Sequence, residues 1–208
     1  MTITTPQEAF WAGQFGNDYV ERNQDTRWID WNTAYYTKLL AKMATPASIL
    51  ELGCNRGLNL HALKRLYPST AFSAVEINAQ AAAHVRRDLP NVDLHHTSIL
   101  EFQPARQWDL VFTNGVLIHL APEALPKVYA LMARASARYV MISEYYNPTP
   151  VEVTYRGHEG RLFKRDFAGE FLDAHPGFKL VDYGFVYHRD PTMHPDDMTW
   201  FLMEKKSS

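Results

Sequence analysis

The fold is decided by the stretch ASILELGCNRGL, residues 47–58. An apolar run ends at Gly53, and a second glycine, Gly57, comes four residues later, just before an amphipathic segment. This pattern predicts a buried strand, a tight turn and a helix. Glycine permits a left-handed backbone and a close approach of the backbone to a ligand, and Asn55 tolerates that geometry better than most residues.

Apolar runs and amphipathic segments alternate along the middle of the chain. We expect strands at residues 47–52, 71–75, 92–95, 108–113 and 139–143, with helices at residues 58–66, 79–88 and 123–134 between them. Strands that alternate with helices of this length imply parallel βαβ units and an α/β fold. Ligands of such sheets bind beyond the carboxyl ends of the strands.

The two ends of the chain lie outside this alternation. In the first 25 residues we expect short amphipathic helices broken at Gly13 and Gly16, followed by a longer helix at residues 27–43. Residues 148–165 predict an inserted loop or hairpin. A helix at residues 166–175 follows, with Asp166 as its N-cap, and then two closing strands at residues 179–188 and 198–204, joined by a long loop.

Composition excludes several classes of protein. The 208 residues carry 21 Lys and Arg against 23 Asp and Glu, so the chain lacks the excess positive charge that a nucleic-acid partner favours. Its apolar runs are too short for a membrane span, and its polar N-terminus predicts no signal peptide. The single cysteine, Cys54, suits a reducing cytosol. We therefore expect a cytoplasmic protein with no membrane or nucleic-acid partner, and the scattered histidines predict no metal site.

The charge around the glycine turn distinguishes two kinds of ligand. Its Gly-x-x-x-Gly spacing differs from the Gly-x-Gly-x-x-Gly of dinucleotide sites, and Glu51 just before it would repel a pyrophosphate but attract an ammonium. Glu76 ends the second strand 25 residues later, where an acid accepts hydrogen bonds from ribose hydroxyls. Ser98 follows the third strand, where an adenine amino group would lie. The pattern favours a cationic, ribose-bearing ligand.

The glycine turn, Glu76, the alternation and the run WDLVFTN (residues 108–114) together resemble the class I S-adenosylmethionine-dependent methyltransferases. The resemblance implies a Rossmann-like, seven-stranded sheet of order 3-2-1-4-5-7-6 with helices on both faces and an antiparallel last strand. It implies one domain, residues 1–208, with a helical lid (1–45), a cofactor-binding core (46–147), and a substrate loop with closing strands (148–208). S-adenosylmethionine would bind Trp11, Phe15, Tyr19, Arg22, Glu51, Gly53, Asn55, Gly57, Glu76, Ile77, Ser98 and Asn114.

A closer resemblance rests on further motifs between residues 8 and 205. These are FGNDY (15–19) with RN (22–23), GVLIHL (115–120), EYYNP (144–148), YRGH (155–158), LFKRDF (162–167) and YGFVYHRD (183–190). They resemble the methylases associated with pseudaminic acid biosynthesis. That resemblance implies a small acceptor, a sugar or nonulosonic acid of surface glycan synthesis, methylated on oxygen or nitrogen.

Two residues at the ligand edge of the sheet are candidates for catalysis. His119 follows the fourth strand, and its titration range suits a general base, although a histidine there can also pack or cap a helix. Glu144 ends the fifth strand and could orient a hydroxyl, act as the base or cap the sheet.

The acceptor is predicted to contact the residues that follow the fifth strand. The basic segment 156–165 is either a solvated loop or a clamp for a carboxylate or phosphate, and we expect an anionic small molecule as partner. Two alternatives remain open: an amino or guanidino acceptor held by Glu144, Glu152 and tyrosines, or a cofactor-binding protein without catalysis. The candidate substrate residues are Tyr145, Tyr146, Asn147, Arg156, His158, Arg161, Lys164, Arg165, His188 and Arg189.

Overall fold

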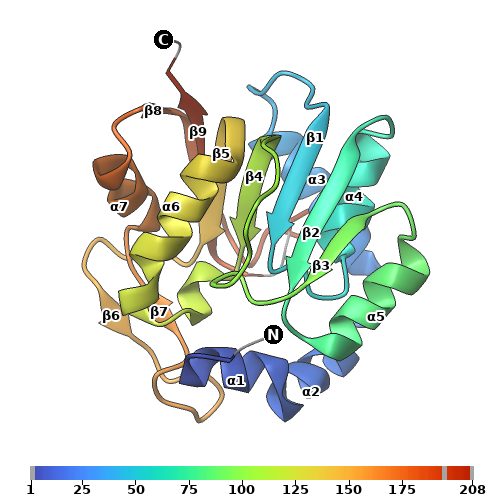
Figure 1. Ribbon diagram of the computed structural model, residues 1–208, viewed down its shortest axis with the longest axis vertical. Helices are drawn as coiled ribbons and strands as arrows, with labels where there is room; N and C mark the ends of the chain where they lie inside the picture. Colours follow the sequence, from blue (N-terminus) through green and yellow to red (C-terminus); the bar gives the residue numbers. More distant parts are fainter. Residues whose placement is uncertain (1–2, 194–195, 207–208) are drawn as a thin grey trace.

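A computed structural model describes residues 3–193 and 196–206, and its centre is one seven-stranded sheet (Figure 1). The strands are β1 (Ser48–Leu52), β2 (Ala71–Glu76), β3 (Asp93–His96), β4 (Trp108–Asn114), β5 (Ser136–Glu144), β8 (Phe178–Val186) and β9 (Met198–Lys205). Their order is β3-β2-β1-β4-β5-β9-β8, and β9 runs antiparallel to both β5 and β8. This confirms the predicted α/β, Rossmann-like sheet, in which β8 and β9 are the sixth and seventh strands in chain order.

Helices cover both faces of the sheet because its strands are apolar on both sides. The helices are α3 (Arg27–Leu39), α4 (Leu58–Leu66), α5 (Ala79–Asp88), α6 (Leu125–Ala135) and α7 (Phe167–Ala174). Leu50 and Leu52 of β1 pack in a cluster with residues of α6 and α7, whereas Ile49 packs with residues of α3, α4 and α5. Full burial of such a side chain stabilises the fold by roughly 1.5–3 kcal/mol.

Two short helices, α1 (Pro6–Ala12) and α2 (Gln14–Arg22), lie across the carboxyl ends of the strands (Figure 1). The expected break at Gly13 is confirmed, because this residue caps both helices. The expected break at Gly16 is wrong, because Gly16 lies inside α2. A Cβ atom there would stand 1.9 Å from the carbonyl oxygen of Trp11, so the missing side chain allows α2 to pack closely on the end of α1.

The helix α3 ends at Leu39, short of the predicted Met43. Leu40 and Met43 are still buried, so the hydrophobic spacing continues past the helical hydrogen bonds. Tyr35 and Tyr36 have no exposed surface, and α3 packs on α4 against the sheet. Within the predicted lid of residues 1–45, therefore, α1 and α2 cover the strand ends, while α3 is part of the core.

The segment after β5 forms a small hairpin of β6 (Val151–Glu152) and β7 (Phe163–Lys164), one of the two forms expected for it. Asp166 caps α7 as predicted, since its side chain accepts a hydrogen bond from Gly169 N at 2.8 Å. The helix expected from residue 123 starts two residues later, because residues 122–124 form a 3₁₀ turn. The predicted loop at residues 189–197 includes residues 194–195, which lie outside the described residues.

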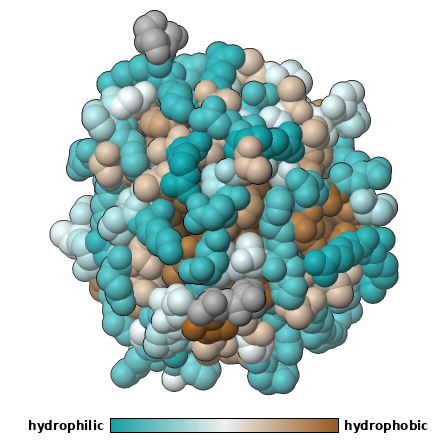
Figure 2. All heavy atoms as spheres, in the orientation of Figure 1, coloured by the Kyte–Doolittle hydropathy of each residue, from teal (hydrophilic) through white to brown (hydrophobic). Residues whose placement is uncertain are grey.

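The surface in Figure 2 is mainly hydrophilic, with hydrophobic residues gathered in patches between the polar ones. Among the described residues, the structure contains no helix with the length and apolar character of a membrane span.

Candidate functional site

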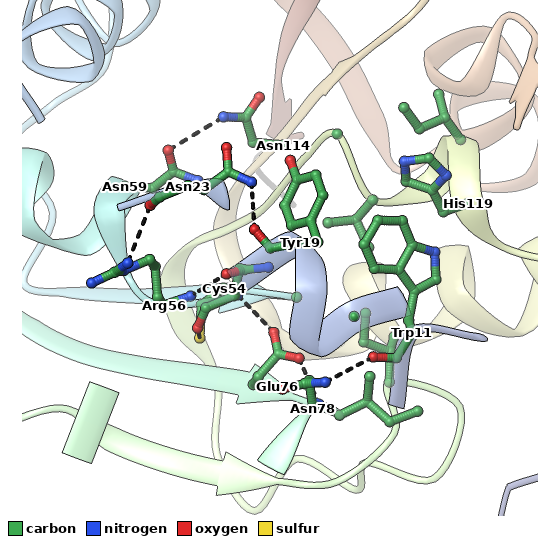
Figure 3. A pocket seen from close by; sticks show the side chains of 18 of the residues that line it. Trp11, Tyr19, Asn23, Cys54, Arg56, Asn59, Glu76, Asn78, Asn114 and His119 are labelled. Atoms are coloured by element: carbon green, nitrogen blue, oxygen red, sulfur yellow. Dashed lines mark hydrogen bonds between the residues drawn. The ribbon is translucent and has the colours of Figure 1, made fainter. Parts of the chain in front are cut away.

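A cavity of about 240 Å³ opens between the carboxyl ends of β1, β2 and β4 and the helices α1 and α2 (Figure 3). This is the edge at which parallel sheets bind ligands. Ten of the residues predicted to form the site line this cavity: Trp11, Tyr19, Gly53, Asn55, Glu76, Ile77, Ser98, Asn114, His119 and Tyr145.

The turn after β1 has the left-handed backbone that its sequence predicts. The φ angles are +80° at Gly53, +48° at Asn55 and +81° at Gly57. A Cβ atom on Gly53 would lie 2.8 Å from a methyl group of Val116, so the site needs glycine there. Gly57 does not line the cavity. It packs on Leu89 and is the N-cap of α4, and thus shapes the turn without lining the cavity.

Glu76 occupies the floor of the cavity at the end of β2. Its carboxylate accepts hydrogen bonds from the backbone N–H of Asn55 at 2.6 Å and of Asn78 at 2.7 Å. Burial raises the pKa of Glu76 above its ordinary value. The side chain is held by these two backbone N–H groups and also lines the cavity, a geometry that suits two ribose hydroxyls as further donors.

Glu51 lies behind the cavity and does not line it. Its carboxylate accepts a hydrogen bond from Asn59 Nδ2 at 2.7 Å, and burial raises its pKa to about 8. The expected attraction for an ammonium group would therefore act through Asn59, a residue of the cavity wall that sequence reasoning missed.

Three asparagines form the wall nearest Glu51. Asn32 and Asn114 both donate to Asn59 Oδ1, at 2.9 and 3.4 Å. Within the described residues, the buried atoms Asn32 Oδ1 and Glu51 Oε2 have no hydrogen-bond partner. A buried acceptor without a donor is costly, and Asn32, unlike Glu51, lines the cavity, so Asn32 Oδ1 fits a ligand ammonium group. An acceptor at this place is what the ammonium group of S-adenosylmethionine would require.

Ser98, Ile77 and Ile99 line the other end of the cavity, where adenine was expected. The Ser98 hydroxyl is already engaged: it hydrogen-bonds Glu8 of α1 and accepts from Leu100 N at 3.0 Å. This serine therefore holds the lid as well as lining the cavity.

The lid residues divide into two groups. Trp11 and Tyr19 line the cavity, and burial raises the pKa of Tyr19 to about 12. Phe15 and Arg22 do not line it. Phe15 stacks on Phe10 with ring centroids 4.0 Å apart, and the Arg22 guanidinium lies 5.4 Å from the Phe15 ring centroid. These two predicted cofactor residues instead brace the lid from outside the cavity.

His119 stands in the cavity wall with a defined tautomer. Its Nδ1 is 2.7 Å from the carbonyl oxygen of Arg161. A carbonyl only accepts, so the proton sits on Nδ1 and the lone pair on Nε2. Burial lowers the pKa of His119 to about 4. Its ring lies against that of Trp11, with centroids 4.6 Å apart (Figure 3). The Tyr155 ring is also close, with its centroid 4.9 Å away. A neutral imidazole of this kind is chemically able to take a proton.

Glu144 does not line the cavity, and its contacts match the capping role among the three expected for it. Its carboxylate accepts from the backbone N–H of Val116, Leu117 and Ile118, at 3.1, 3.0 and 3.4 Å. It is 2% exposed, and burial raises its pKa to about 7. Its oxygens hold the turn that carries His119, so these contacts favour the capping role, and its assignment as a base stays a prediction.

Most of the predicted substrate residues surround the cavity without lining it. Tyr145 is in the wall, whereas Tyr146 is 41% exposed and Asn147 folds its own loop by donating to Thr149 O at 2.6 Å. His188 pairs with Asp197 at 2.9 Å, Arg189 is exposed, and neither His188 nor Arg189 lines the cavity.

The basic residues of the hairpin loop do not line the cavity either, because the hairpin runs beside the lid. Arg156 and Lys164 lie over Tyr155 and Tyr145, two tyrosines of the cavity wall, at 5.9 and 5.4 Å from the ring centroids. The other three pack elsewhere. The Arg161 guanidinium and the His158 ring lie against Phe10 of the lid, and Arg165 pairs with Glu170 at 2.7 Å.

Sequence reasoning missed much of the lining because it comes from segments far apart in the chain. Two of the missed residues carry a local signal: Asn78 as a helix N-cap residue directly after the second strand, and Glu8 as the acid of a capping box with Thr5. In the part of the chain that the structure describes, no group of three or more side chains suitable for a metal ion occurs. The main missed residues are Gln7, Glu8, Asn23, Trp28, Asn32, Arg56, Asn59, Asn78, Tyr155 and Asp196.

Comparison with known proteins agrees with this geometry. Residues 49–138 match a family model described as a methyltransferase domain. Trans-aconitate 2-methyltransferase of Methylobacterium nodulans is 31% identical over 119 residues, which cover 50% of this chain and 46% of that protein. The chain spans about half the length of the curated relatives it matches.

Solved structures match over most or all of the chain. The 1,6-didemethyltoxoflavin-N1-methyltransferase of Burkholderia thailandensis, with bound S-adenosylhomocysteine, has a TM-score of 0.71 at 19% identity, covering 100% of this chain and 93% of that one. An amino pentose methyltransferase from Micromonospora echinaspora has a TM-score of 0.65 at 16% identity, covering 92% and 96%.

The fold of this protein is Rossmann-like, and residues 49–138 match a methyltransferase domain. The part that the family model describes runs from β1 into β5 and contains the glycine turn, Glu76 and His119.

Proposed function

We propose that this chain transfers the methyl group of S-adenosylmethionine to an oxygen or nitrogen of a small, anionic, sugar-derived acceptor such as a nonulosonic acid. The observation that carries the proposal is the neutral His119 in the cavity wall, with its proton on Nδ1 and its Nε2 as the acceptor. The closer family resemblance of the motifs in residues 8–205 supports the sugar-derived acceptor.

The chemistry asks little of the protein beyond alignment and proton removal. When bound, the cofactor supplies a methyl carbon activated by its sulfonium. His119 Nε2 takes the proton that the acceptor heteroatom loses as it gains the methyl group, and a general base contributes about 10²–10⁴-fold. Trp11 and Tyr19 cover the site and exclude water.

Two unsatisfied atoms of the lid support a polar acceptor. The buried atoms Gln7 Oε1 and Trp11 Nε1 have no hydrogen-bond partner among the described residues, and both residues line the cavity. One atom accepts and the other donates. A hydroxyl-rich ligand would form hydrogen bonds with both atoms. An apolar ligand would leave both atoms buried and unpaired, which is energetically costly.

The charges at the cavity rim support an anionic acceptor. Arg156 and Lys164 lie over Tyr155 and Tyr145, and so bring positive charge to the edge of the wall. The curated relative from Methylobacterium nodulans is named for trans-aconitate, which is a carboxylate compound.

One observation favours the amino or guanidino acceptor as a second candidate. Asp196 lines the cavity and hydrogen-bonds Tyr145. A carboxylate among tyrosines would attract a protonated amine, and the aromatic faces would add to that attraction.

The test is methyl transfer from S-adenosylmethionine carrying a deuterated methyl group, read by mass spectrometry. The acceptor panel contains nonulosonic acids, amino sugars and guanidino compounds, and His119→Asn is the control for catalysis. A labelled nonulosonic acid would support the first proposal, and label only on an amine or guanidine would favour the second. Cofactor binding without transfer to any acceptor would contradict both and favour a protein without catalysis.

A further inference from the structure

Asn78 lies at the junction of β2, α5 and the lid. Its backbone N–H, its Oδ1 and its Nδ2 all form hydrogen bonds there. It stands two residues after Glu76 and is 2% exposed. Toward the core, its backbone N–H donates to Glu76 Oε1 at 2.7 Å, and its Oδ1 accepts from Ala81 N at 2.9 Å, which caps α5. The conformation of Asn78 is therefore tied directly to the carboxylate proposed to hold the ribose.

The amide nitrogen of Asn78 binds both lid helices. Nδ2 donates to the carbonyl oxygen of Trp11, at the end of α1, at 3.1 Å (Figure 3). It also donates to Asn17 Oδ1 of α2 at 2.9 Å. Gly16 makes room for this contact, since a Cβ atom there would lie 2.8 Å from Asn78 Nδ2. A single core residue, Asn78, thus holds both helices of the lid.

The two helices that Asn78 holds also carry residues of the wall around His119. Trp11 and Tyr19 project from these helices into the cavity, and the Trp11 ring lies 4.6 Å from the His119 ring. A second tether, between Glu8 and Ser98, lies on the same side at the expected adenine end. Both tethers connect the lid to the part of the cavity assigned to the cofactor.

We propose that Asn78 is a positioning residue that couples cofactor binding to closure of the lid, so that the donor must bind before the acceptor wall is complete. This inference rests on the proposed function. Ligand hydroxyls on Glu76 fix the carboxylate, the carboxylate fixes Asn78, and the Asn78 amide fixes α1 and α2. Binding energy at the ribose is passed in this way to the acceptor side as a coupling between two sites.

The variant Asn78→Ser separates the cap that Asn78 gives to α5 from its hydrogen bonds to the lid. Serine is as good an N-cap as asparagine, so α5 keeps its cap, but the two donors to the lid are lost. S-adenosylhomocysteine is the probe, and hydrogen exchange followed by mass spectrometry is the measurement. In the unaltered chain, the ligand should protect both the turn at residues 53–57 and the lid at residues 6–22.

In Asn78→Ser, the turn should stay protected while the lid exchanges about ten-fold faster, as expected for the loss of two ordinary hydrogen bonds. Asn17→Ala removes one of the two acceptors and should give a smaller increase. Asn91→Ser changes an exposed asparagine and should leave the lid unchanged. Dissociation of S-adenosylhomocysteine, measured by stopped flow, should also be faster in Asn78→Ser.

The outcomes distinguish the inference from the function on which it rests. If the unaltered chain does not bind S-adenosylhomocysteine, the proposed function fails, and the coupling fails with it. If the ligand binds and protects the lid of Asn78→Ser as fully as that of the unaltered chain, only the coupling through Asn78 is overturned.

Discussion

His119 donates its Nδ1 proton to the carbonyl oxygen of Arg161 across 2.7 Å, which joins the turn after β4 to the loop between β6 and β7. The acceptor is a backbone atom, so a change of the Arg161 side chain would not remove it. This hydrogen bond engages Nδ1 and so leaves Nε2 as the imidazole nitrogen that can accept a proton. It also gives the loop between β6 and β7 a role that does not depend on the charge of that loop.

Replacement of His119 by asparagine should reduce kcat by about 10²–10⁴-fold, the contribution of a general base. The asparagine amide can still donate to Arg161 O, so the turn keeps its tie to the hairpin. Affinity for S-adenosylhomocysteine, measured by calorimetry, should change little. Turnover equal to that of the unaltered chain would remove His119 from the role of base.

The pH dependence of kcat/KM should report the same residue. Burial lowers the pKa of His119 to about 4, so the imidazole is neutral and able to accept a proton at all pH values above that. Activity should rise with pH around 4 and stay level through neutral pH, within the range where the protein remains folded. A rise centred near the ordinary histidine value would show that His119 is not held neutral.

Replacement of Glu76 by glutamine should weaken binding of S-adenosylhomocysteine by roughly 10- to 100-fold, since hydrogen bonds to a charged group are the strong ones. The amide oxygen cannot serve both backbone donors and the ribose hydroxyls together. Isothermal calorimetry measures the affinity, and Glu123→Gln, at an exposed acid, is the matched control. Equal affinities in the two variants would count against the ribose assignment.

Replacement of Glu51 by glutamine should flatten the pH dependence of stability. The pKa of Glu51 is raised to about 8, so between its unfolded value near 4.5 and pH 8 the folded chain binds more protons than the unfolded chain. Stability from this group is present at low pH and is lost as pH rises. Urea unfolding across this range should show a smaller loss in Glu51→Gln, and an unchanged slope would contradict the burial argument.

Replacement of Gly53 by alanine should destabilise the fold by about 1–3 kcal/mol through backbone strain, and more through contact with Val116. Gly115→Ala is the matched control, because Gly115 also has a positive φ, +66°, but a Cβ atom there meets nothing within 4 Å. The difference between the two variants in urea unfolding isolates the steric part. Equal losses would place all of the effect in the backbone conformation.

The strands and turns were predictable because local patterns indicate each of them, whereas the order of the sheet followed from the class resemblance. Gly53, Asn55 and Gly57 all have the positive φ values that their turn requires. The alternation of buried residues along β1 assigns Leu50 to one face and Ile49 to the other. Gly16 was misread because a glycine in a short amphipathic segment signals either a break or a close approach, and only the packing of α2 on α1 distinguishes them.

The candidate site was predictable in part, for a related reason. Residues at strand ends, such as Glu76 and His119, are carried to one edge of the sheet by the topology itself. Arg156 and Lys164 belong to a basic segment whose charge is plain in the sequence, but the path of the hairpin keeps them at the rim of the cavity.

The sequence by itself determined the turn at residues 53–57 and the strand-end carboxylate of Glu76, because these depend on backbone conformation and short-range periodicity, and the order of the strands followed from the class resemblance. Only the tertiary structure decided that Glu144 caps a turn, that Asn59 stands in front of Glu51, and that Asn78 holds the lid. Such roles depend on which donor meets which acceptor between segments distant in the chain, and packing alone sets those distances.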